Sequence, residues 1–286
     1  MASLTGQGLT SSQIKSRYAK RIEVFIEGQD DIAVYGTFWF KHLADRLQFR
    51  LAEDGPAKHS GCVGVEKNVA IQRTAGIDAY GIIDRDSLED IPVACATDDN
   101  AFLASNRARD PYVYFTLRWE LENYLVDPAT WERERVDLLH RGAGQRLDQE
   151  VVEELVAHCE ALIPHAAANA FRKERGKQKL GDGACRVYAD RAEVQRFLDT
   201  NILTGLNATE RAEYDAWVQR IEAFDEPTAP PAERLVKLCR RIHGKALLDR
   251  FCYRHRLQVD IRFAVARVLS GNVPSELNDA ISGWIG

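Results

Sequence analysis

The chain has 286 residues, of which 45% are hydrophobic, and its 38 basic and 43 acidic side chains give a formal net charge of −5. This composition excludes a disordered chain, because such chains combine low hydrophobicity with high net charge, and it allows one large or two modest domains. No apolar run approaches the roughly 18–20 residues needed to cross a bilayer, so we expect a globular protein that is not inserted in a membrane.

The N-terminal segment is polar and then basic, with no apolar stretch behind the charges. A secretory signal peptide needs such a stretch, so we expect a cytoplasmic protein. The six cysteines are widely spaced and form no close pair. This spacing favours reduced thiols over a disulfide framework or a structural zinc site.

The first half of the chain alternates short apolar runs with longer amphipathic ones. Strands are predicted at 22–26, 48–53, 79–83 and 112–117, where β-branched and aromatic side chains are frequent. A helix is predicted directly after Gly28, and a second one over about residues 66–74. Strands separated by helices indicate βαβ units, so the sequence predicts an α/β fold with a parallel sheet flanked by helices.

From about residue 128 onward, helical patterns dominate. Helices are predicted at 128–140, 148–170, 190–201, 209–224, 231–242, 244–256 and 258–270, with breaks at Pro164, Gly205, 227–231 and Gly271. We therefore expect an α/β domain over residues 1–130 and a mainly helical domain over residues 131–286, which serves for binding a substrate or a partner.

Positive charge is concentrated late in the chain. Residues 234–286 carry 10 basic and 4 acidic side chains, a net charge of +6, and a further basic cluster lies in FRKERGKQKLGDG, whose glycines predict a loop. Such residues are candidates for contacts with nucleic-acid phosphates. The candidates are Arg172, Lys173, Arg175, Lys177, Lys179, Arg240 and Arg241. The alternative is a solvated helix face with a charged loop.

Acidic residues follow two of the predicted strands. Glu27 follows the strand at 22–26, and Asp84 and Asp86 follow the strand at 79–83. The carboxyl ends of parallel strands form the edge at which open α/β folds bind ligands. In an extended chain two aspartates that are two positions apart point the same way and can share one cation.

The donor chemistry of these residues indicates which ion they suit. Carboxylate oxygens with no histidine or cysteine nearby favour Mg²⁺ or Mn²⁺ over zinc. The alternative is that the acids only cap the structures that follow the strands. In that case Asp30 or Asp31 caps a helix after Glu27, and Asp86 starts a turn with Ser87.

The segments IEVFIEGQDDIAVYGTFW and GIIDRDS resemble the toprim domain. This α/β metal-binding module occurs in type II topoisomerases, bacterial primases and overcoming-lysogenization-defect (OLD) nucleases. Together with ELENYL, the two segments resemble most a branch near the OLD nucleases. That branch includes nuclease effectors of two-component anti-phage systems, which work with a separate ABC-type ATPase. The resemblance covers roughly residues 20–130, and HGKALLDRF at 243–251 is similar to a later helix of the family.

The resemblance implies roles for individual residues. Glu27 is implied as a metal ligand or general acid/base, and Asp31, Asp84 and Asp86 as further metal ligands. Glu122 is implied as another metal ligand, in preference to its neighbour Glu120. Lys245 is implied as a catalytic contact to the phosphate or to the transition state, with a solvated lysine as the alternative.

The function implied is an Mg²⁺- or Mn²⁺-dependent nuclease that cleaves RNA, such as transfer RNA, or DNA. The sequence has no GxxxxGK[ST] motif, so ATP hydrolysis would have to come from the ATPase partner. A primase or a topoisomerase is not favoured, because we find neither a zinc ribbon nor a tyrosine on a separate DNA-gate domain. The number of metal ions and a homo-oligomeric state are left open.

Two alternative functions are also compatible with the sequence. One is a non-catalytic toprim-like scaffold that docks the ATPase. The other is a toprim phosphotransferase or hydrolase that acts on a nucleotide and leaves polynucleotides intact.

Overall fold

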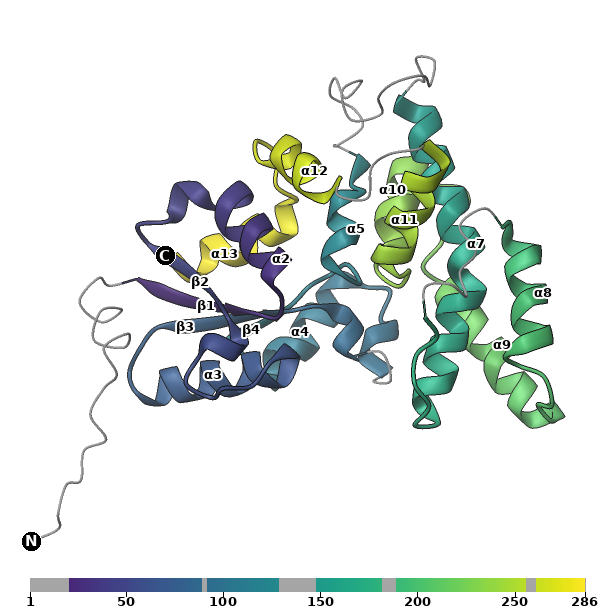
Figure 1. Ribbon diagram of the computed structural model, residues 1–286, viewed down its shortest axis with the longest axis horizontal. Coiled ribbons are helices and arrows are strands. Elements are labelled where there is room, and N and C mark those ends of the chain that lie inside the picture. Colours follow the sequence, from purple (N-terminus) through teal and green to yellow (C-terminus); the bar gives the residue numbers. More distant parts are fainter. Residues whose placement is uncertain (1–20, 89–91, 129–147, 182–188, 256–260, 286) are drawn as a thin grey trace, which may run out of the picture. The chain divides into compact units, whose positions relative to one another are not determined.

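The computed structural model describes residues 21–88, 92–128, 148–181, 189–255 and 261–285 (Figure 1). The chain forms two compact units. Unit 1 comprises Met1–Ile83, Asp110–Tyr114 and Asn278–Gly286, and unit 2 comprises Asp84–Arg109 and Phe115–Leu277. These boundaries differ from the predicted one near residue 130, because the chain passes between the two units four times.

The sheet has four strands in the order β2-β1-β3-β4. They are β1 (Ile22–Ile26), β2 (Leu47–Leu51), β3 (Ala79–Ile83) and β4 (Val113–Phe115). Strand β1 runs parallel to both β2 and β3, and Val24 pairs with Phe49 on one side and Tyr80 on the other. The α/β prediction is confirmed, and β1 and β3 have the predicted bounds.

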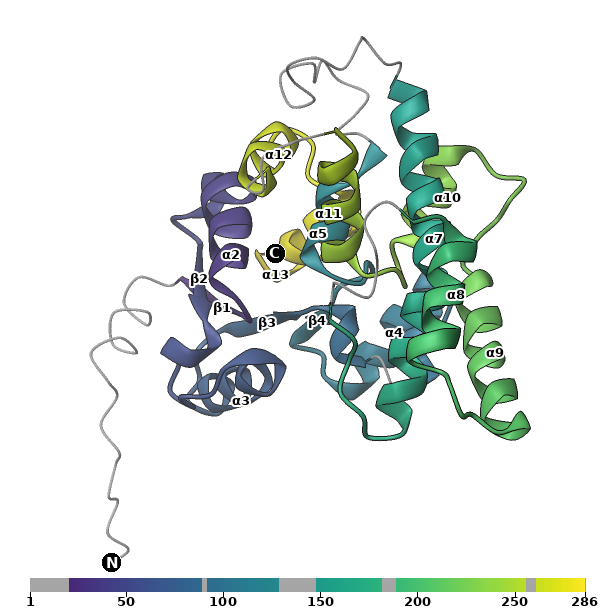
Figure 2. The ribbon, with the colours of Figure 1, turned by 45° about the vertical axis from the view of Figure 1, so that its right-hand side comes forward.

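Helices cover both faces of the sheet in unit 1. Figures 1 and 2 show α3 (Gly61–Thr74) on one face and α2 (Gln29–Asp31) on the other. The helix predicted after Gly28 is present, but it is not one regular α-helix, since α2 continues as a π-helix over Ile32–Trp39. Tyr35 of this π-helix is buried, and its ring stacks on Phe49 of β2 with centroids 6.1 Å apart.

Unit 2 is helical in the part that the structure describes. Its helices are α4 (Asp99–Arg109), α5 (Leu121–Leu125), α7 (Asp148–Glu174), α8 (Arg191–Asn201), α9 (Ala208–Glu222), α10 (Pro231–Leu238), α11 (Gly244–His255), α12 (Arg262–Leu269) and the start of α13 (Ser275–Ile285). The mainly helical C-terminal part is therefore confirmed, while the helix predicted at 128–140 falls almost entirely outside the described residues. Helix α4 was not predicted, because Phe102 and Asn106 are its only buried residues and its apolar period is weak.

Helix α7 is the central helix of unit 2 and packs against α8, α9, α10 and α11 (Figures 1 and 2). The predicted break at Pro164 is wrong, because α7 runs through it. A proline inside a helix costs about 3 kcal/mol. Its neighbours Leu162, Ile163 and Ala167 are fully buried, and burial of one Leu or Ile side chain contributes about 1.5–3 kcal/mol. Packing on several helices therefore offsets the cost of the proline.

Two further expectations concern the membrane and the cysteines. None of the helices in the described part of the chain combines the length and the apolar character that crossing a bilayer requires. The five described cysteines are all free thiols, as predicted, and Cys185 lies outside the described residues.

Candidate active site

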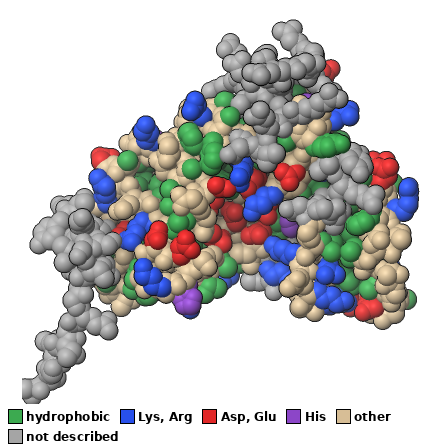
Figure 3. Space-filling model, viewed as in Figure 1, with side chains coloured by type: hydrophobic (Ala, Val, Ile, Leu, Met, Phe, Trp, Pro, Cys, Tyr) green, Lys and Arg blue, Asp and Glu red, His purple; other side chains and the backbone are tan. Residues whose placement is uncertain are grey.

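Four carboxylates of unit 2 gather around one lysine, and we call this group the acidic site. Its members are Asp84, Asp86, Glu120, Glu122 and Lys245. The removal of water from around Lys245 would lower its pKa, but the four carboxylates raise it. Figure 3 shows acidic side chains gathered near the middle of the face in view, with basic side chains beside them. The structure therefore brings together the predicted Asp84, Asp86, Glu122 and Lys245.

Asp84 and Asp86 both lie in a turn that follows β3. Asp84 directly follows β3, and Arg85–Leu88 form a 3₁₀-helix. The carbonyl oxygen of Asp84 accepts hydrogen bonds from the N–H of Ser87 (3.2 Å) and from its hydroxyl (2.8 Å). The prediction that an extended chain aligns the two aspartates is wrong, and the turn predicted as the alternative is present.

The middle residue of the DRD motif fixes this turn. Arg85 is fully buried, and its guanidinium donates to the carbonyl oxygens of Leu117 (2.9 Å) and Ala96 (2.8 Å). Burial and the positive charges of Arg241 and Arg240 lower the pKa of Arg85 to about 9. The inward-pointing arginine leaves the aspartates on either side of it partly exposed.

The turn is bonded to the segment that leads into α5. The N–H of Asp86 donates to the carbonyl oxygen of Trp119 (3.0 Å), and the N–H of Leu121 donates to Oδ2 of Asp84 (3.3 Å). Because one bond runs in each direction, the DRD turn and the first residues of α5 hold each other in place. This arrangement positions Glu120, the N-cap of α5, beside Asp86.

Glu120 also joins α5 to α11. Its N–H donates to Oδ1 of Asn123 (2.9 Å), whose Nδ2 donates to the carbonyl oxygen of Ile242 (3.0 Å). The N–H of Lys245 in turn donates to Oε2 of Glu120 (3.0 Å). A Cβ at Gly244 would lie 2.5 Å from Oδ1 of Asn123, so this close approach of α5 and α11 requires glycine. The HGK segment therefore belongs to the acidic site.

The environment of Glu120 changes its protonation. Burial raises its pKa to about 7, and the negative charges of Asp86 and Glu122 add to this shift, while Lys245 opposes it. An isolated glutamate would be fully ionised at neutral pH. Glu120 therefore holds its proton for part of the time at neutral pH, which limits the negative charge in the acidic site.

Several cationic groups surround the carboxylates. Nζ of Lys179 lies 3.1 Å from Oδ2 of Asp86, and Nη1 of Arg262 lies 3.6 Å from Oε1 of Glu122. His243 lies 3.9 Å from Glu120, but burial and the charges of His165 and Lys179 hold its pKa well below the ordinary value. His243 is therefore neutral, and the positive charge comes from lysine and arginine.

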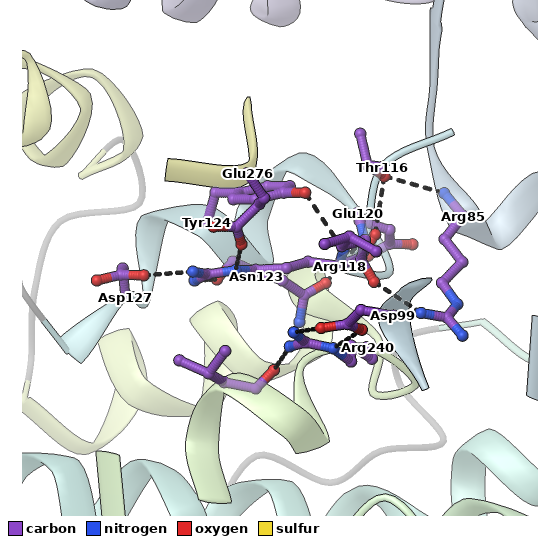
Figure 4. A network of polar contacts seen from close by, with 12 residues as sticks. Arg85, Asp99, Thr116, Arg118, Glu120, Asn123, Tyr124, Asp127, Arg240 and Glu276 are labelled. Atoms are coloured by element: carbon purple, nitrogen blue, oxygen red, sulfur yellow. Dashed lines mark hydrogen bonds and ion pairs between the residues drawn. The ribbon is translucent and has the colours of Figure 1, made fainter. Parts of the chain in front are cut away.

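A network of buried polar contacts supports α5 (Figure 4). Arg118 is its centre, with Nε donating to Glu276 (3.0 Å) and Nη2 to Asp127 (2.5 Å). Burial alone would lower the pKa of Arg118, but these two carboxylates raise it. Thr116 accepts a hydrogen bond from the N–H of Arg85 (3.1 Å) and donates one to the carbonyl oxygen of Arg118 (2.8 Å). The network thus connects the DRD turn to the support of α5.

Two predicted site residues, Glu27 and Asp31, lie in unit 1. Glu27 directly follows β1, and because β1 and β3 are parallel, Glu27 leaves the sheet at the edge where β3 also ends. Oδ2 of Asp31 accepts a hydrogen bond from the N–H of Gly28 (2.8 Å), as in the capping alternative. Their roles as metal ligands stay predictions.

Part of the predicted basic loop belongs to α7, and some of its side chains have partners within the protein. Arg172 and Lys173 form the last turn of α7, so the predicted loop begins only at Arg175. Nε of Arg172 donates to the carbonyl oxygen of Gln178 (2.9 Å), and Arg175 pairs with Glu213. Lys177 and Lys179 are exposed.

Arg240 and Arg241 lie in the interior of unit 2. Arg240 is 7% exposed and pairs with Asp99 (Figure 4). Arg241 is fully buried, with its guanidinium 4.0 Å from the ring centroid of Trp119. Both guanidinium groups are therefore buried and in contact with other residues of unit 2, so the prediction that they bind a nucleic acid is wrong for this arrangement.

The acidic site suits a hard cation by its chemistry. All its donors are carboxylate oxygens, which Mg²⁺ and Mn²⁺ prefer, and Asp86 is 27% exposed. Within the residues that the structure describes, no group of three or more His, Cys, Asp or Glu side chains is arranged to hold a metal ion. Binding of a cation therefore requires the carboxylates to move toward it.

The resemblance favours Glu122 over Glu120, yet Glu120 is the residue bonded to Lys245 and influenced by Asp86. The position of Glu120 directly before α5 is the local signal for its role, because an N-cap side chain lies at the amino end of its helix. The partner of Glu120 lies 125 residues later and gave no local signal.

No protein-family model, curated protein or solved structure matches this chain.

Proposed function

We propose that the protein is a divalent-cation-dependent nuclease of the toprim type, which hydrolyses phosphodiester bonds in RNA, such as transfer RNA, or in DNA. The observation that carries this proposal is the gathering of Asp84, Asp86, Glu120 and Glu122 around Lys245. The resemblance of the EGQDD and IDRD segments to the toprim signature supports the same proposal.

Asp84, Asp86 and Glu122 of unit 2 would hold Mg²⁺ or Mn²⁺. Glu27 and Asp31 of unit 1 are ligands by the resemblance alone. When bound, a divalent cation supplies neutralisation of the charge that develops on the phosphoryl oxygens, and it orients the scissile bond. The two aspartates are suited to this role because they are partly exposed while Arg85 between them fixes the turn.

Lys245 would contact the phosphate. Its side chain is exposed, and the surrounding carboxylates keep it charged. An ammonium group has three donors for phosphoryl oxygens, and a contact that strengthens as charge develops lowers the barrier. Its backbone N–H is fixed by Glu120, so the side chain starts from a defined position.

Glu120 is suited to transfer a proton. Its pKa of about 7 lies near neutral pH, where a group is most effective in general acid–base catalysis. Oε2 accepts the N–H of Lys245, which leaves Oε1 as the oxygen that can give a proton to the leaving group.

The resemblance extends the proposal to a biological role. By this resemblance the protein would be an effector of an anti-phage abortive-infection system, cytoplasmic and controlled by a separate ABC-type ATPase. The sequence has no GxxxxGK[ST] motif, so under this proposal any ATP hydrolysis would come from the partner.

A non-catalytic scaffold that docks the ATPase is the second candidate. The observation that favours it is that no metal-holding group is preformed among the described residues, while Lys179 pairs with Asp86. A scaffold would cut no nucleic acid, with or without its partner.

A cleavage assay separates the two. The full chain is incubated with labelled total RNA and plasmid DNA in Mg²⁺, Mn²⁺ or EDTA, beside Asp86→Asn, Glu27→Ala and the exposed control Asp45→Asn. We expect cutting that needs the metal, is lost in the first two variants and is retained in the control. Cutting in EDTA, or by Asp86→Asn at the normal rate, would contradict the proposal. No cutting even with the ATPase added favours the scaffold.

A further inference from the structure

We infer that Lys179 is a built-in competitor of the divalent cation, which holds Asp86 in the metal-free protein and has to leave before Asp86 binds metal. This inference rests on the proposed function and adds a form of regulation to the same site. The lysine then raises the cation concentration that is needed to occupy the site.

The contact itself is specific. Nζ of Lys179 lies 3.1 Å from Oδ2 of Asp86, and 93 residues separate the two in the chain. Lys179 is 38% exposed and Asp86 is 27% exposed. The pair is therefore made by the fold, yet it stays accessible to ions from solution.

The end of α7 directs the chain toward this contact. Gly176 has a φ of 65°, which favours glycine. Its N–H donates to the carbonyl oxygen of Lys173 (2.8 Å), and the N–H of Lys177 donates to that of Arg172 (2.9 Å). These two bonds form a Schellman motif, which ends the helix and reverses the chain.

A second set of bonds fixes the far side of Lys179. The N–H of Leu180 donates to Oδ1 of Asn169 (2.7 Å), a residue that is 1% exposed. Nδ2 of Asn169 lies 3.3 Å from Nε2 of His243. Lys179 is thus held between a fixed helix end and a buried asparagine.

Competition follows from the charges. An ammonium and a divalent cation repel each other, so the two compete for Oδ2 of Asp86. Partly exposed ion pairs are weak, so the cation can displace Lys179. After it leaves Asp86, the ammonium of Lys179 is still part of the basic segment, whose residues are candidates for contacts with phosphates. Lys179 therefore weakens metal binding without preventing it.

The test is a calorimetric titration of the full chain with Mn²⁺ alone. From the strength of exposed ion pairs we expect Lys179→Met to lower the Kd for Mn²⁺ about two- to fivefold. Lys179→Arg should behave as the wild type. Lys177→Met removes the same charge two positions away and is the matched control, for which we expect a clearly smaller change. Lys179→Gln repeats the test with a polar side chain of similar length.

The outcomes separate the inference from the proposed function. Equal Mn²⁺ affinity in the wild type and in Lys179→Met overturns the inference and leaves the metal site standing. An equal gain in Lys179→Met and Lys177→Met also overturns it, because general electrostatics then suffices. Weaker binding by Lys179→Met overturns it as well. If no variant binds Mn²⁺, the proposed function fails and the inference fails with it.

Discussion

The backbone N–H of Lys245 donates a hydrogen bond to Oε2 of Glu120, although 125 residues separate them. This bond joins the first turn of α11 to the N-cap of α5. It links two motifs that the sequence presents far apart, ELENYL and HGK. The chemistry proposed for the acidic site depends on this junction, because it holds the proposed proton donor, Glu120, next to the proposed phosphate contact, Lys245.

Replacement of Glu120 should change how stability depends on pH. The pKa of Glu120 is raised from 4.5 to about 7, so its contribution is fully present below pH 4.5 and is lost as the pH rises through 7. In Glu120→Gln this loss disappears, and the fall in the free energy of unfolding between pH 4.5 and 8 should shrink by up to about 3 kcal/mol. Urea denaturation in EDTA measures it. The exposed control Glu53→Gln should keep the wild-type profile, and an identical profile in Glu120→Gln would refute the assignment.

Asn123 should be important for stability. It is fully buried, and Asn123→Ala leaves the N–H of Glu120 and the carbonyl oxygen of Ile242 without these partners. An unsatisfied buried group costs about 1–3 kcal/mol, so we expect a loss of about 2–4 kcal/mol in urea denaturation. Asn201→Ala, at an exposed helix end, should cost under about 0.5 kcal/mol. Similar losses in the two variants would contradict the role of Asn123.

Arg118 should stabilise unit 2 through its two carboxylate partners. Arg118→Met leaves Asp127 (13% exposed) and Glu276 (17% exposed) without their common cation. Removal of one partner from a buried ion pair costs about 3–5 kcal/mol, and partial exposure places the expected loss near the lower value. The matched control is Arg211→Met, whose ion pairs with Asp199 and Asp215 are exposed, with an expected loss of about 1 kcal/mol or less. Thermal and urea denaturation compare the two, and equal losses would count against the network.

Lys245 should affect the rate of cleavage more than the binding of metal. Lys245→Met removes a charge next to the phosphate, and loss of such a contact typically lowers kcat about 10²-fold. Mn²⁺ affinity should stay the same or rise, since a positive charge leaves the carboxylates. The exposed control Lys237→Met should leave both quantities unchanged. If Lys245→Met weakens Mn²⁺ binding, Lys245 organises the carboxylates instead.

Local patterns predicted the sheet and most of the acids. The β-branched runs at β1 and β3 gave exact bounds, and the aspartates after β3 are part of the acidic site. These features depend on neighbours in the chain, so composition and period reveal them.

Features that depend on distant residues were not predictable. The DRD turn depends on Arg85 reaching the carbonyl oxygen of Leu117, 32 residues later. The burial of Arg241 depends on its packing over Trp119. Pro164 stays inside α7 because other helices pack around it. In each case a tertiary contact outweighs the local preference.

The most direct test of the central claim is the binding of Mn²⁺ to the full chain, followed by electron paramagnetic resonance. The wild type and the control Asp45→Asn should bind Mn²⁺ saturably. The double variant Asp84→Asn/Asp86→Asn should bind at least about tenfold more weakly, because two anionic ligands are lost. Equal binding by the wild type and the double variant would show that the acidic site is not the metal site.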